Sequence, residues 1–447
     1  MSGPPLSAGA SLLPVEFAEH LPRHHYPVGI VQLFLRGVLE AAVSQRGVAA
    51  FFRLLASCLP TPVANTGRAW LLRVGLYELT RPKEQAEDWV WIMDHTLQLG
   101  PWKCLIIVGV RLSAWEPQRG PLAHEDLALL NLTPMEHSSG EAVAEQLRAA
   151  VPQTSRPRAI LTDGGADLKR GIELFGVDQP GVAHVQDIKH KGATILKRHL
   201  EADTRWQAFS TRANQTKREV TQTRLAYLNP PAQKNKARYM NLDALISWGR
   251  EALAFLEHPR PVTAQPVDAA TLTKKLGWLG EYRAALEEWS EWLALLQVAE
   301  DYIRREGFHA GAVEELRREL LPLATGPVAR QMQAELLAFV GEQSAQARPG
   351  ERLIGNSEVI ESLIGKYKRL QGTHSQGGMT AMLLSIGAIV AEKTTEMVRE
   401  ALTAIPTQNV RDWCRNHLGI TLQAQRRFAF SGNKSEIQND HPQAVSF

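Results

Sequence analysis

A change of hydrophobic period near Glu87 constrains this chain more than any other feature of its sequence. Before Glu87, apolar residues recur at helical spacing. After it, Trp89–Met93 and Cys104–Leu112 are rich in the β-branched and aromatic residues that are typical of strands. Gly100 and Pro101 between them predict a turn. The chain must therefore build a sheet, and the helical segments around it are candidates to cover its faces.

Three more strands and two helices are predicted in the same region. They are a strand at Leu127–Leu132, a helix opening near Ser139 with Glu141 and Glu145 in its early turns, a strand at Ala159–Thr162, a helix at Ala166–Leu174 and a strand at Val182–Asp187. The first three strands can pair antiparallel, and the two that follow helices add in parallel. The predicted fold class is α/β, with a mixed five-stranded sheet and flanking helices.

Three short helices are predicted before the sheet, at Val28–Val43, Gly47–Leu59 and Pro62–Leu79. Thr61 is a plausible N-cap for the third helix, with Pro62 as its first residue. A short turn between the second and third helices permits a helix-turn-helix that recognises DNA. A plain cluster of packed helices is the alternative.

A second helical block is predicted between about Leu200 and Gln346, and its charge is asymmetric. Gln186–Tyr239 holds twelve Lys and Arg against four Asp and Glu, whereas Glu281–Leu320 holds five against ten. The basic half is a candidate for phosphate contact, with Lys234, Lys236 and Arg238 as candidate DNA-binding residues. Alternatively, these charges form a solvated helix face or pair with the acidic half.

Composition excludes several classes of protein. The 447 residues are 44% hydrophobic and carry a net charge of +3, which neither demands nor excludes a nucleic-acid partner. Three cysteines far apart in sequence, Cys58, Cys104 and Cys414, form no metal-ligand pattern and fit a reducing compartment. Neither a signal peptide nor a membrane span is predicted, so the expected location is the cytoplasm.

Two aspartates follow strongly apolar strands. Asp94 ends the first strand, and Asp163 ends the fourth and precedes two glycines that allow a tight turn. In the predicted strand order the first and fourth strands are central, adjacent and parallel, so the two carboxylates should converge. Converging carboxylates are what divalent cations require. A third acid is available on the helix predicted at Ser357–Arg369, as Glu358 or Glu361.

With these residues the sequence resembles the DDE transposase and retroviral-integrase superfamily, which is built on the RNase H-like fold. The resemblance covers Glu87–His190 and Asn356–Arg369. Asn356, Glu361 and Lys368 match the spacing of the family's Asn-x-x-x-x-Glu-x-x-x-x-x-x-Lys helix signature. The match favours Glu361, and Glu358 would take its place in a different helix register.

The resemblance implies further DNA contacts. Asp187 and His190 resemble a Cys/Asp-x-x-His motif of transposases with helical insertions, such as hAT-type elements. His190 could orient a phosphate or the scissile strand, and polar surface is the alternative. Some of Lys366, Lys368 and Arg369 must share a helix side with Glu361, where they would meet the DNA backbone.

The resemblance also implies a domain order. A helix-turn-helix-like DNA-binding domain at residues 1–84 precedes an RNase H-like catalytic domain at 85–200 and 348–405. An all-helical insertion at 201–347 interrupts that domain, and a tail follows at 406–447.

The implied activity is that of a DNA transposase of an insertion element. Asp94, Asp163 and Glu361 would bind two Mg²⁺ or Mn²⁺ ions for cleavage and strand transfer. The implied partners are transposon ends, target DNA and at least one further copy of the chain, on the nucleoid of a prokaryote. The alternatives are an RNase H-like nuclease that selects DNA structures and a transposase-derived regulator without catalysis.

Overall fold

The computed structural model describes residues 14–56, 58–99, 102–232, 242–258, 269–372 and 379–418, with residues 426, 429 and 430. The chain divides into two compact units. We call Met1–Pro117, Pro121–Ala183 and Ser357–Phe447 the sheet unit, and Gln118–Gly120 with His184–Asn356 the helical unit. The helical unit thus begins earlier and ends later than the insertion predicted at 201–347.

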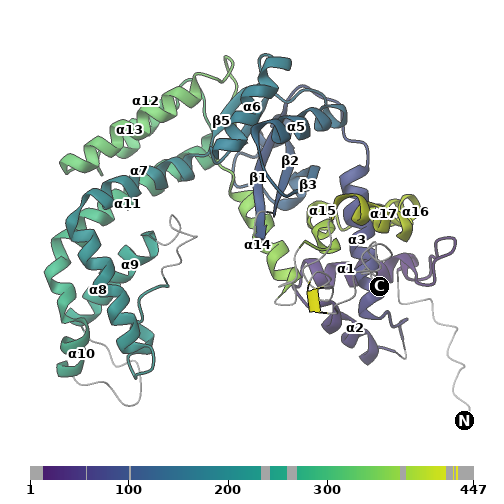
Figure 1. Ribbon diagram of the computed structural model, residues 1–447, viewed down its shortest axis with the longest axis horizontal. Helices are drawn as coiled ribbons and strands as arrows, with labels where there is room; N and C mark the ends of the chain where they lie inside the picture. Colours follow the sequence, from purple (N-terminus) through teal and green to yellow (C-terminus); the bar gives the residue numbers. More distant parts are fainter. Residues whose placement is uncertain are drawn as a thin grey trace, which may run out of the picture. The chain divides into compact units, whose positions relative to one another are not determined.

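The predicted mixed five-stranded sheet is confirmed (Figure 1). Its spatial order is β3-β2-β1-β4-β5. Strand β1 pairs antiparallel with β2 and parallel with β4, and β2 pairs antiparallel with β3. The strands are β1 (Trp89–Leu99), β2 (Trp102–Arg111), β3 (Ala128–Met135), β4 (Ala159–Thr162) and β5 (Ala183–Gln186). The predicted turn at Gly100 and Pro101 lies outside the described residues.

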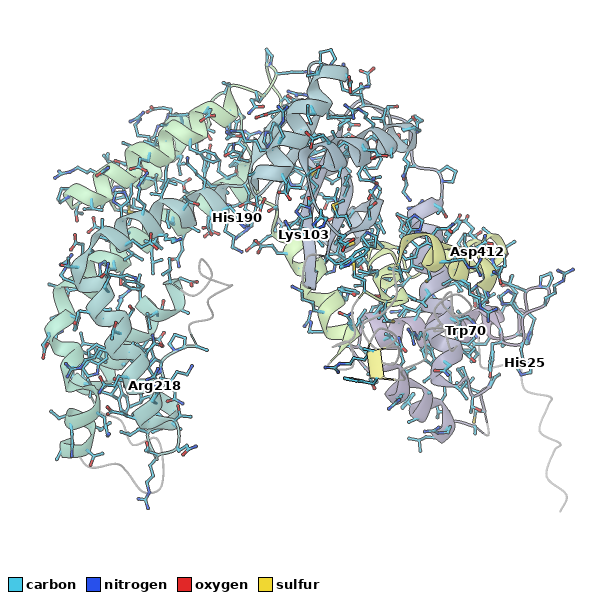
Figure 2. All side chains as sticks on the ribbon, in the orientation of Figure 1. His25, Trp70, Lys103, His190, Arg218 and Asp412 are labelled. Atoms are coloured by element: carbon cyan, nitrogen blue, oxygen red, sulfur yellow. The ribbon has the colours of Figure 1, made fainter. Side chains whose placement is uncertain are left out.

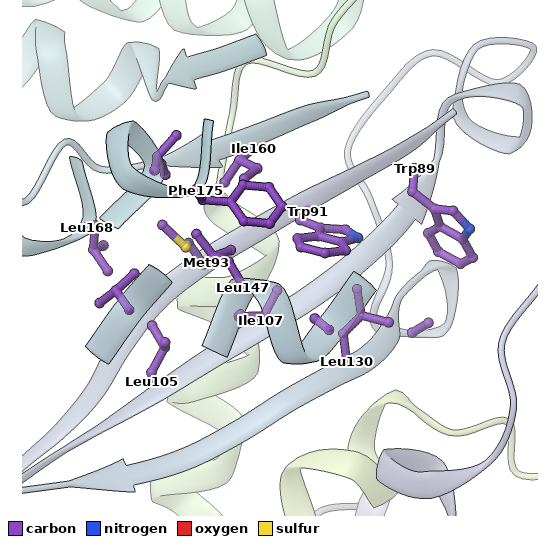
Figure 3. Close-up of a cluster of buried hydrophobic side chains, with 14 of the residues drawn as sticks. Trp89, Trp91, Met93, Leu105, Ile107, Leu130, Leu147, Ile160, Leu168 and Phe175 are labelled. Atoms are coloured by element: carbon purple, nitrogen blue, oxygen red, sulfur yellow. The ribbon is translucent and has the colours of Figure 1, made fainter. Parts of the chain in front are cut away.

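One face of the sheet packs against α5 (Gly140–Thr154) and α6 (Ala166–Asp178). Alternate residues of β1 form the centre of this core, because side chains of a strand point to opposite faces in turn. Figure 3 shows the core that they form with β2, β4 and the two helices. Its members include Trp89, Trp91, Met93, Leu105, Ile107, Leu147, Ile160, Leu168 and Phe175.

The opposite face of the sheet packs against α14 (Glu358–Gln371), which contacts β1. Val90 and Ile92 of β1 point to this face and are fully buried. Burial, and secondly the nearby Cys104 of β2, raises the pKa of Tyr367 in α14. Helix α14 therefore covers the face to which the even-numbered side chains of β1 point.

The three N-terminal helices form as predicted, with one shifted start. They are α1 (Val28–Leu39), α2 (Gln45–Leu54) and α3 (Ala64–Thr80). The N-cap of α3 is Val63, so Thr61 and Pro62 precede the helix instead of starting it. Helix α3 packs against α15 (Ser385–Val390) and α16 (Thr395–Ala404).

The helix-turn-helix interpretation does not fit this packing. Residues 55–63 separate α2 from α3, a longer connection than such a motif uses. Much of α3 is buried, including Trp70, Leu72 and Val74. Residues 14–84 belong to the same unit as the sheet rather than to a separate domain, and α3 is not exposed for insertion into a DNA groove.

A close backbone crossing explains why α3 is buried. A Cβ on Gly75 of α3 would overlap the carbonyl oxygen of Leu384, and a Cβ on Gly387 of α15 would overlap the carbonyl of Gly75. Leu384 belongs to η6 (Ala381–Leu384). Two glycines therefore let the chain on either side of the helical unit meet backbone to backbone.

The segment predicted as a tail begins with a folded helix. Helix α17 (Thr407–His417) packs against α3 and buries Val410, Trp413 and Cys414. Its apolar residues recur at helical spacing, and α3 provides the surface that buries them.

The helical unit is built around aromatic side chains. Its helices are α7 (Ile188–Ala202), α8 (Thr204–Val220), α9 (Leu242–Glu257), α10 (Ala269–Leu276), α11 (Arg283–Glu306), α12 (Ala312–Leu320) and α13 (Pro327–Ser344). Phe209 is fully buried, and its ring lies 5.3–6.4 Å from those of Trp206, Trp248, Trp278, Tyr282 and Trp289. The tryptophans form a core and do not offer exposed rings on which bases could stack.

In the part of the chain that the structure describes, no helix is both long enough and apolar enough to cross a membrane.

We expect Gly75→Ala to destabilise the sheet unit by about 2 kcal/mol or more, because the added methyl overlaps backbone that cannot move independently. The control is Gly176→Ala in α6, where a Cβ meets nothing within 4 Å. That substitution should stabilise by about 0.5–1 kcal/mol through helix propensity. Urea denaturation followed by circular dichroism measures both, and equal stabilities would contradict the close crossing.

Candidate active site

Asp94 and Asp163 each follow the paired part of two parallel strands. The last paired residues of β1 and β4 are Ile92 and Leu161, and each aspartate lies two residues further along its chain. Asp94 points, by alternation along β1, to the face that α14 covers, whereas Asp163 follows the end of β4 and belongs to the turn into α6. Asp94 is not at a strand end as predicted, because β1 continues to Leu99 and pairs Asp94 with Ile106 of β2.

A tight turn holds Asp163. The carboxylate Oδ1 accepts a hydrogen bond from the backbone N–H of Gly165 at 2.9 Å, and the N–H of Gly164 donates to Oγ1 of Thr162 at 3.2 Å. Gly164 has φ 84°, a left-handed conformation that glycine adopts without strain. The predicted role of the two glycines in turning the chain from β4 into α6 is confirmed at Gly164. Both aspartates are half-buried.

Glu358 and Glu361 both lie in the first turn of α14, whose N-cap is Ser357. The positive end of the helix dipole stabilises carboxylates at this place. Both glutamates are half-buried, so burial does not select one of them. The helix packs on the sheet through Val359, Ile360, Leu363, Ile364 and Tyr367.

The three predicted metal ligands are not gathered into one cluster. Among the described residues, no group of three or more His, Cys, Asp and Glu side chains lies close enough together to hold a metal ion. Asp94 and Asp163 each lie two residues beyond the paired Ile92 and Leu161, and Glu361 belongs to α14, which contacts β1. The three-carboxylate site itself stays a prediction.

The basic residues of α14 divide into two groups. Lys368 is exposed and lies seven residues after Glu361, which is close to two full turns, so both residues share one side of the helix. Lys366 is half-buried on another side. Burial and the charge of Lys393 lower its pKa, and Glu125 opposes this effect. Arg369 also contributes to that environment. Of the three predicted DNA contacts in α14, Lys368 thus lies nearest in phase to Glu361.

Asp187 and His190 belong to the helical unit, where a capping interaction explains their spacing. Asp187 is the N-cap of α7, and its Oδ1 accepts from the backbone N–H of His190 at 2.8 Å. The side chain of Asp187 is only 1% exposed, whereas His190 is half-buried. Three residues between acceptor and donor is the usual capping distance. The spacing therefore has a structural cause, and a phosphate contact by His190 stays a prediction.

The basic segment of the helical unit is partly exposed. Arg218 and Arg224 are exposed, as Figure 2 shows for Arg218. Arg205 pairs with Glu288 at 2.7 Å, so the basic and acidic halves are joined at one point at least. Lys234, Lys236 and Arg238 lie outside the described residues.

Sequence reasoning missed a polar cluster on the α5 and α6 face of the sheet. We call His95, Lys103, Ser138 and Asp167 the linking cluster. His95 Nε2 lies 3.0 Å from Ser138 Oγ, and its Nδ1 lies 3.8 Å from Asp167 Oδ2. Lys103 Nζ, labelled in Figure 2, lies 3.4 Å from the same oxygen. The available signals were the position of His95 next to Asp94 and that of Asp167 one turn after Asp163.

Electrostatics make Asp167 the anion of the linking cluster. Burial alone would raise the pKa of Asp167, but a hydrogen bond from Ser138 and the charges of His95 and Lys103 outweigh it, and the pKa is lowered. Burial is the largest cause that lowers the pKa of His95, with Lys103 adding to it and Asp167 and Asp163 opposing it.

No protein-family model matches the chain, and no curated protein matches it. Among the solved structures to which the chain is similar is one described as the Drosophila P element transposase strand transfer complex, with a TM-score of 0.43 and 9% identity. The alignment covers 85% of this chain and 94% of that one.

We expect Gly164→Ala to destabilise the sheet unit by about 1–2 kcal/mol, because alanine disfavours a left-handed conformation. Gly164→Asn should cost less, since asparagine tolerates that conformation. Gly181→Ala is the reference for the cost of a left-handed conformation without steric overlap, because Gly181 has φ 87° and open space around its Cβ. Thermal and urea unfolding measure the three variants, and a Gly164→Ala protein as stable as the unsubstituted chain would refute the described turn.

Proposed function

We propose that this chain is a transposase-type enzyme that cleaves and joins DNA, with Asp94, Asp163 and Glu361 as its metal-binding carboxylates. The observation that carries the proposal is that Asp94 and Asp163 each lie two residues beyond Ile92 and Leu161, which pair on the two adjacent parallel strands at the centre of the sheet. Two carboxylates that approach each other repel, and a cation that both bind removes this repulsion.

The residue types at this place fit a hard divalent cation. Carboxylate oxygens are the ligands that Mg²⁺ and Mn²⁺ prefer, and here one is supplied by strand β1 and one by the turn that follows β4. We assign the third position to Glu361, which α14 carries on the same face of the sheet. When bound, a pair of such ions would activate the attacking hydroxyl and stabilise the leaving oxygen of an in-line phosphoryl transfer.

The remaining residues would position the DNA. Lys368 shares a helix side with Glu361 and is exposed, so it would pair with a backbone phosphate close to the carboxylates. Arg369 and the exposed Arg218 and Arg224 would add contacts that do not depend on base sequence. Such contacts position the duplex, and the carboxylates supply the site of reaction.

The proposal predicts a separation of DNA binding from cleavage. Asp94→Asn, Asp163→Asn and Glu361→Gln keep side-chain shape but remove a charge, so each should reduce cleavage by at least about 100-fold. Binding of the DNA that flanks the gene should stay within about two-fold. Nicking of a supercoiled plasmid with that DNA, in Mg²⁺ and in Mn²⁺, measures cleavage, and fluorescence anisotropy measures binding.

Glu358→Gln is the matched control, because it lies in the same helix turn and should retain most activity. Activity in Glu361→Gln with loss in Glu358→Gln would reverse the assignment within α14. Substantial cleavage by Asp94→Asn or Asp163→Asn would refute the metal-binding carboxylates. Cleavage without joining to a second plasmid would identify a nuclease, and binding without any cleavage would identify a regulator.

A second prediction concerns salt dependence. Each phosphate contact that is lost lowers the slope of log affinity against log salt by roughly one unit. We expect that decrease for Lys368→Ala. The control Lys169→Ala removes an exposed charge from α6, on the other face of the sheet, and should leave the slope unchanged. Equal slopes for both variants would exclude a phosphate contact by Lys368.

A further inference from the structure

The linking cluster connects the two chain segments that carry Asp94 and Asp163. We propose that Asp167, held by His95, Ser138 and Lys103, is a positioning residue that fixes the distance between those two carboxylates. This inference rests on the proposed function, because it assigns a role in the same site.

The cluster joins four separate pieces of the fold. His95 belongs to β1, Lys103 to β2 and Asp167 to the first turn of α6, and Ser138 directly precedes Ser139, the N-cap of α5. Each contacts at least one other through the distances of 3.0 to 3.8 Å given above. Helix α6 is thereby tied to β1 and β2 at its first turn, where the Asp163 loop enters it.

The position of His95 in β1 couples the linking cluster to Asp94. Consecutive side chains of a strand point to opposite faces, so His95 points to the α5 and α6 face while Asp94 points to the α14 face. Any shift of β1 that moves His95 relative to Asp167 also moves Asp94. The cluster therefore acts on Asp94 through one peptide unit, whose N–H at His95 also donates to Oδ1 of Asp94 at 2.6 Å.

The loop around Gly165 couples the linking cluster to Asp163. A Cβ on Gly165 would lie 3.3 Å from Oδ1 of Asp163 and 3.4 Å from Oδ1 of Asp167, so the two carboxylates flank one point of the backbone. Two anions so near each other repel, and Lys103 compensates the charge of Asp167. Asp167 can then anchor the loop while Asp163 stays available to a cation.

A charge-conserving substitution separates positioning from simple electrostatics. Asp167→Glu keeps the anion but moves its oxygens by one methylene, and Ser138→Ala removes a hydroxyl without changing any charge. Residues that orient metal ligands typically contribute about tenfold or more to metal affinity. The matched control is Asp178→Glu, in the same helix, where Asp178 forms an exposed ion pair with Arg148.

Mn²⁺ is titrated into the full chain bound to a duplex of its flanking DNA, and free Mn²⁺ is measured by electron paramagnetic resonance. We expect Asp167→Glu and Ser138→Ala each to weaken Mn²⁺ binding about tenfold. In the plasmid assay kcat should fall while the half-saturating DNA concentration is unchanged. Asp178→Glu should match the unsubstituted chain in both measurements.

The outcomes distinguish this inference from the proposed function. A lower melting temperature with unchanged Mn²⁺ affinity in Asp167→Glu and Ser138→Ala would show that the cluster is only structural. This result would overturn the inference alone, provided that Asp94→Asn and Asp163→Asn lose Mn²⁺ binding. Mn²⁺ affinity unaffected by Asp94→Asn and Asp163→Asn, or no Mn²⁺ binding by the unsubstituted chain, would overturn both.

Discussion

The parallel pairing of β1 with β4 is the constraint on which the rest of this structure depends. It brings segments about seventy residues apart to the centre of one sheet, and Asp94 and Asp163 each lie two residues beyond its last pair, Ile92 and Leu161. The α5 and α6 layer and the α14 layer then pack on opposite faces of this pair. Because the side chains of β1 alternate, Met93 and His95 point to the α5 and α6 layer and Asp94 points to the α14 layer.

The sheet could be predicted from the sequence because the patterns that indicate each strand lie within that strand and the turns beside it. Ala159–Thr162 was predicted with the bounds that β4 has, since a short β-branched run between two turns leaves little choice. The parallel placement of the first and fourth strands followed from the order of helices and strands. The extension of β1 to Leu99 was missed because Asp94 and His95 interrupt the apolar pattern, although β2 supplies partners for both.

The sequence is least informative where tertiary packing determines the structure. The third helix has the turn signals of a DNA-reading helix, yet Gly75 and Gly387 bring it against α15, more than 300 residues later in the chain. The tryptophans of the helical unit gather around Phe209, which spacing alone does not show. The spacing of Asp187 and His190 fits both a family motif and a helix cap, because both place an acceptor three residues before its partner.

Strand β1 continues past its last apolar residue, so one short segment contributes polar side chains to both faces of the sheet. In β1, Asp94 points to the α14 face and His95 to the α5 and α6 face, so a proposed ligand and the group that positions it are neighbours in sequence but lie on opposite sides of the sheet. After β4, the turn at Gly164 leads into a loop in which Asp163 and Asp167 each have a carboxylate oxygen within 3.4 Å of the Cβ position of Gly165. Substitutions in the linking cluster can thus change the distance between the carboxylates without placing a new atom among them. For this reason the cluster offers a test of geometry apart from chemistry.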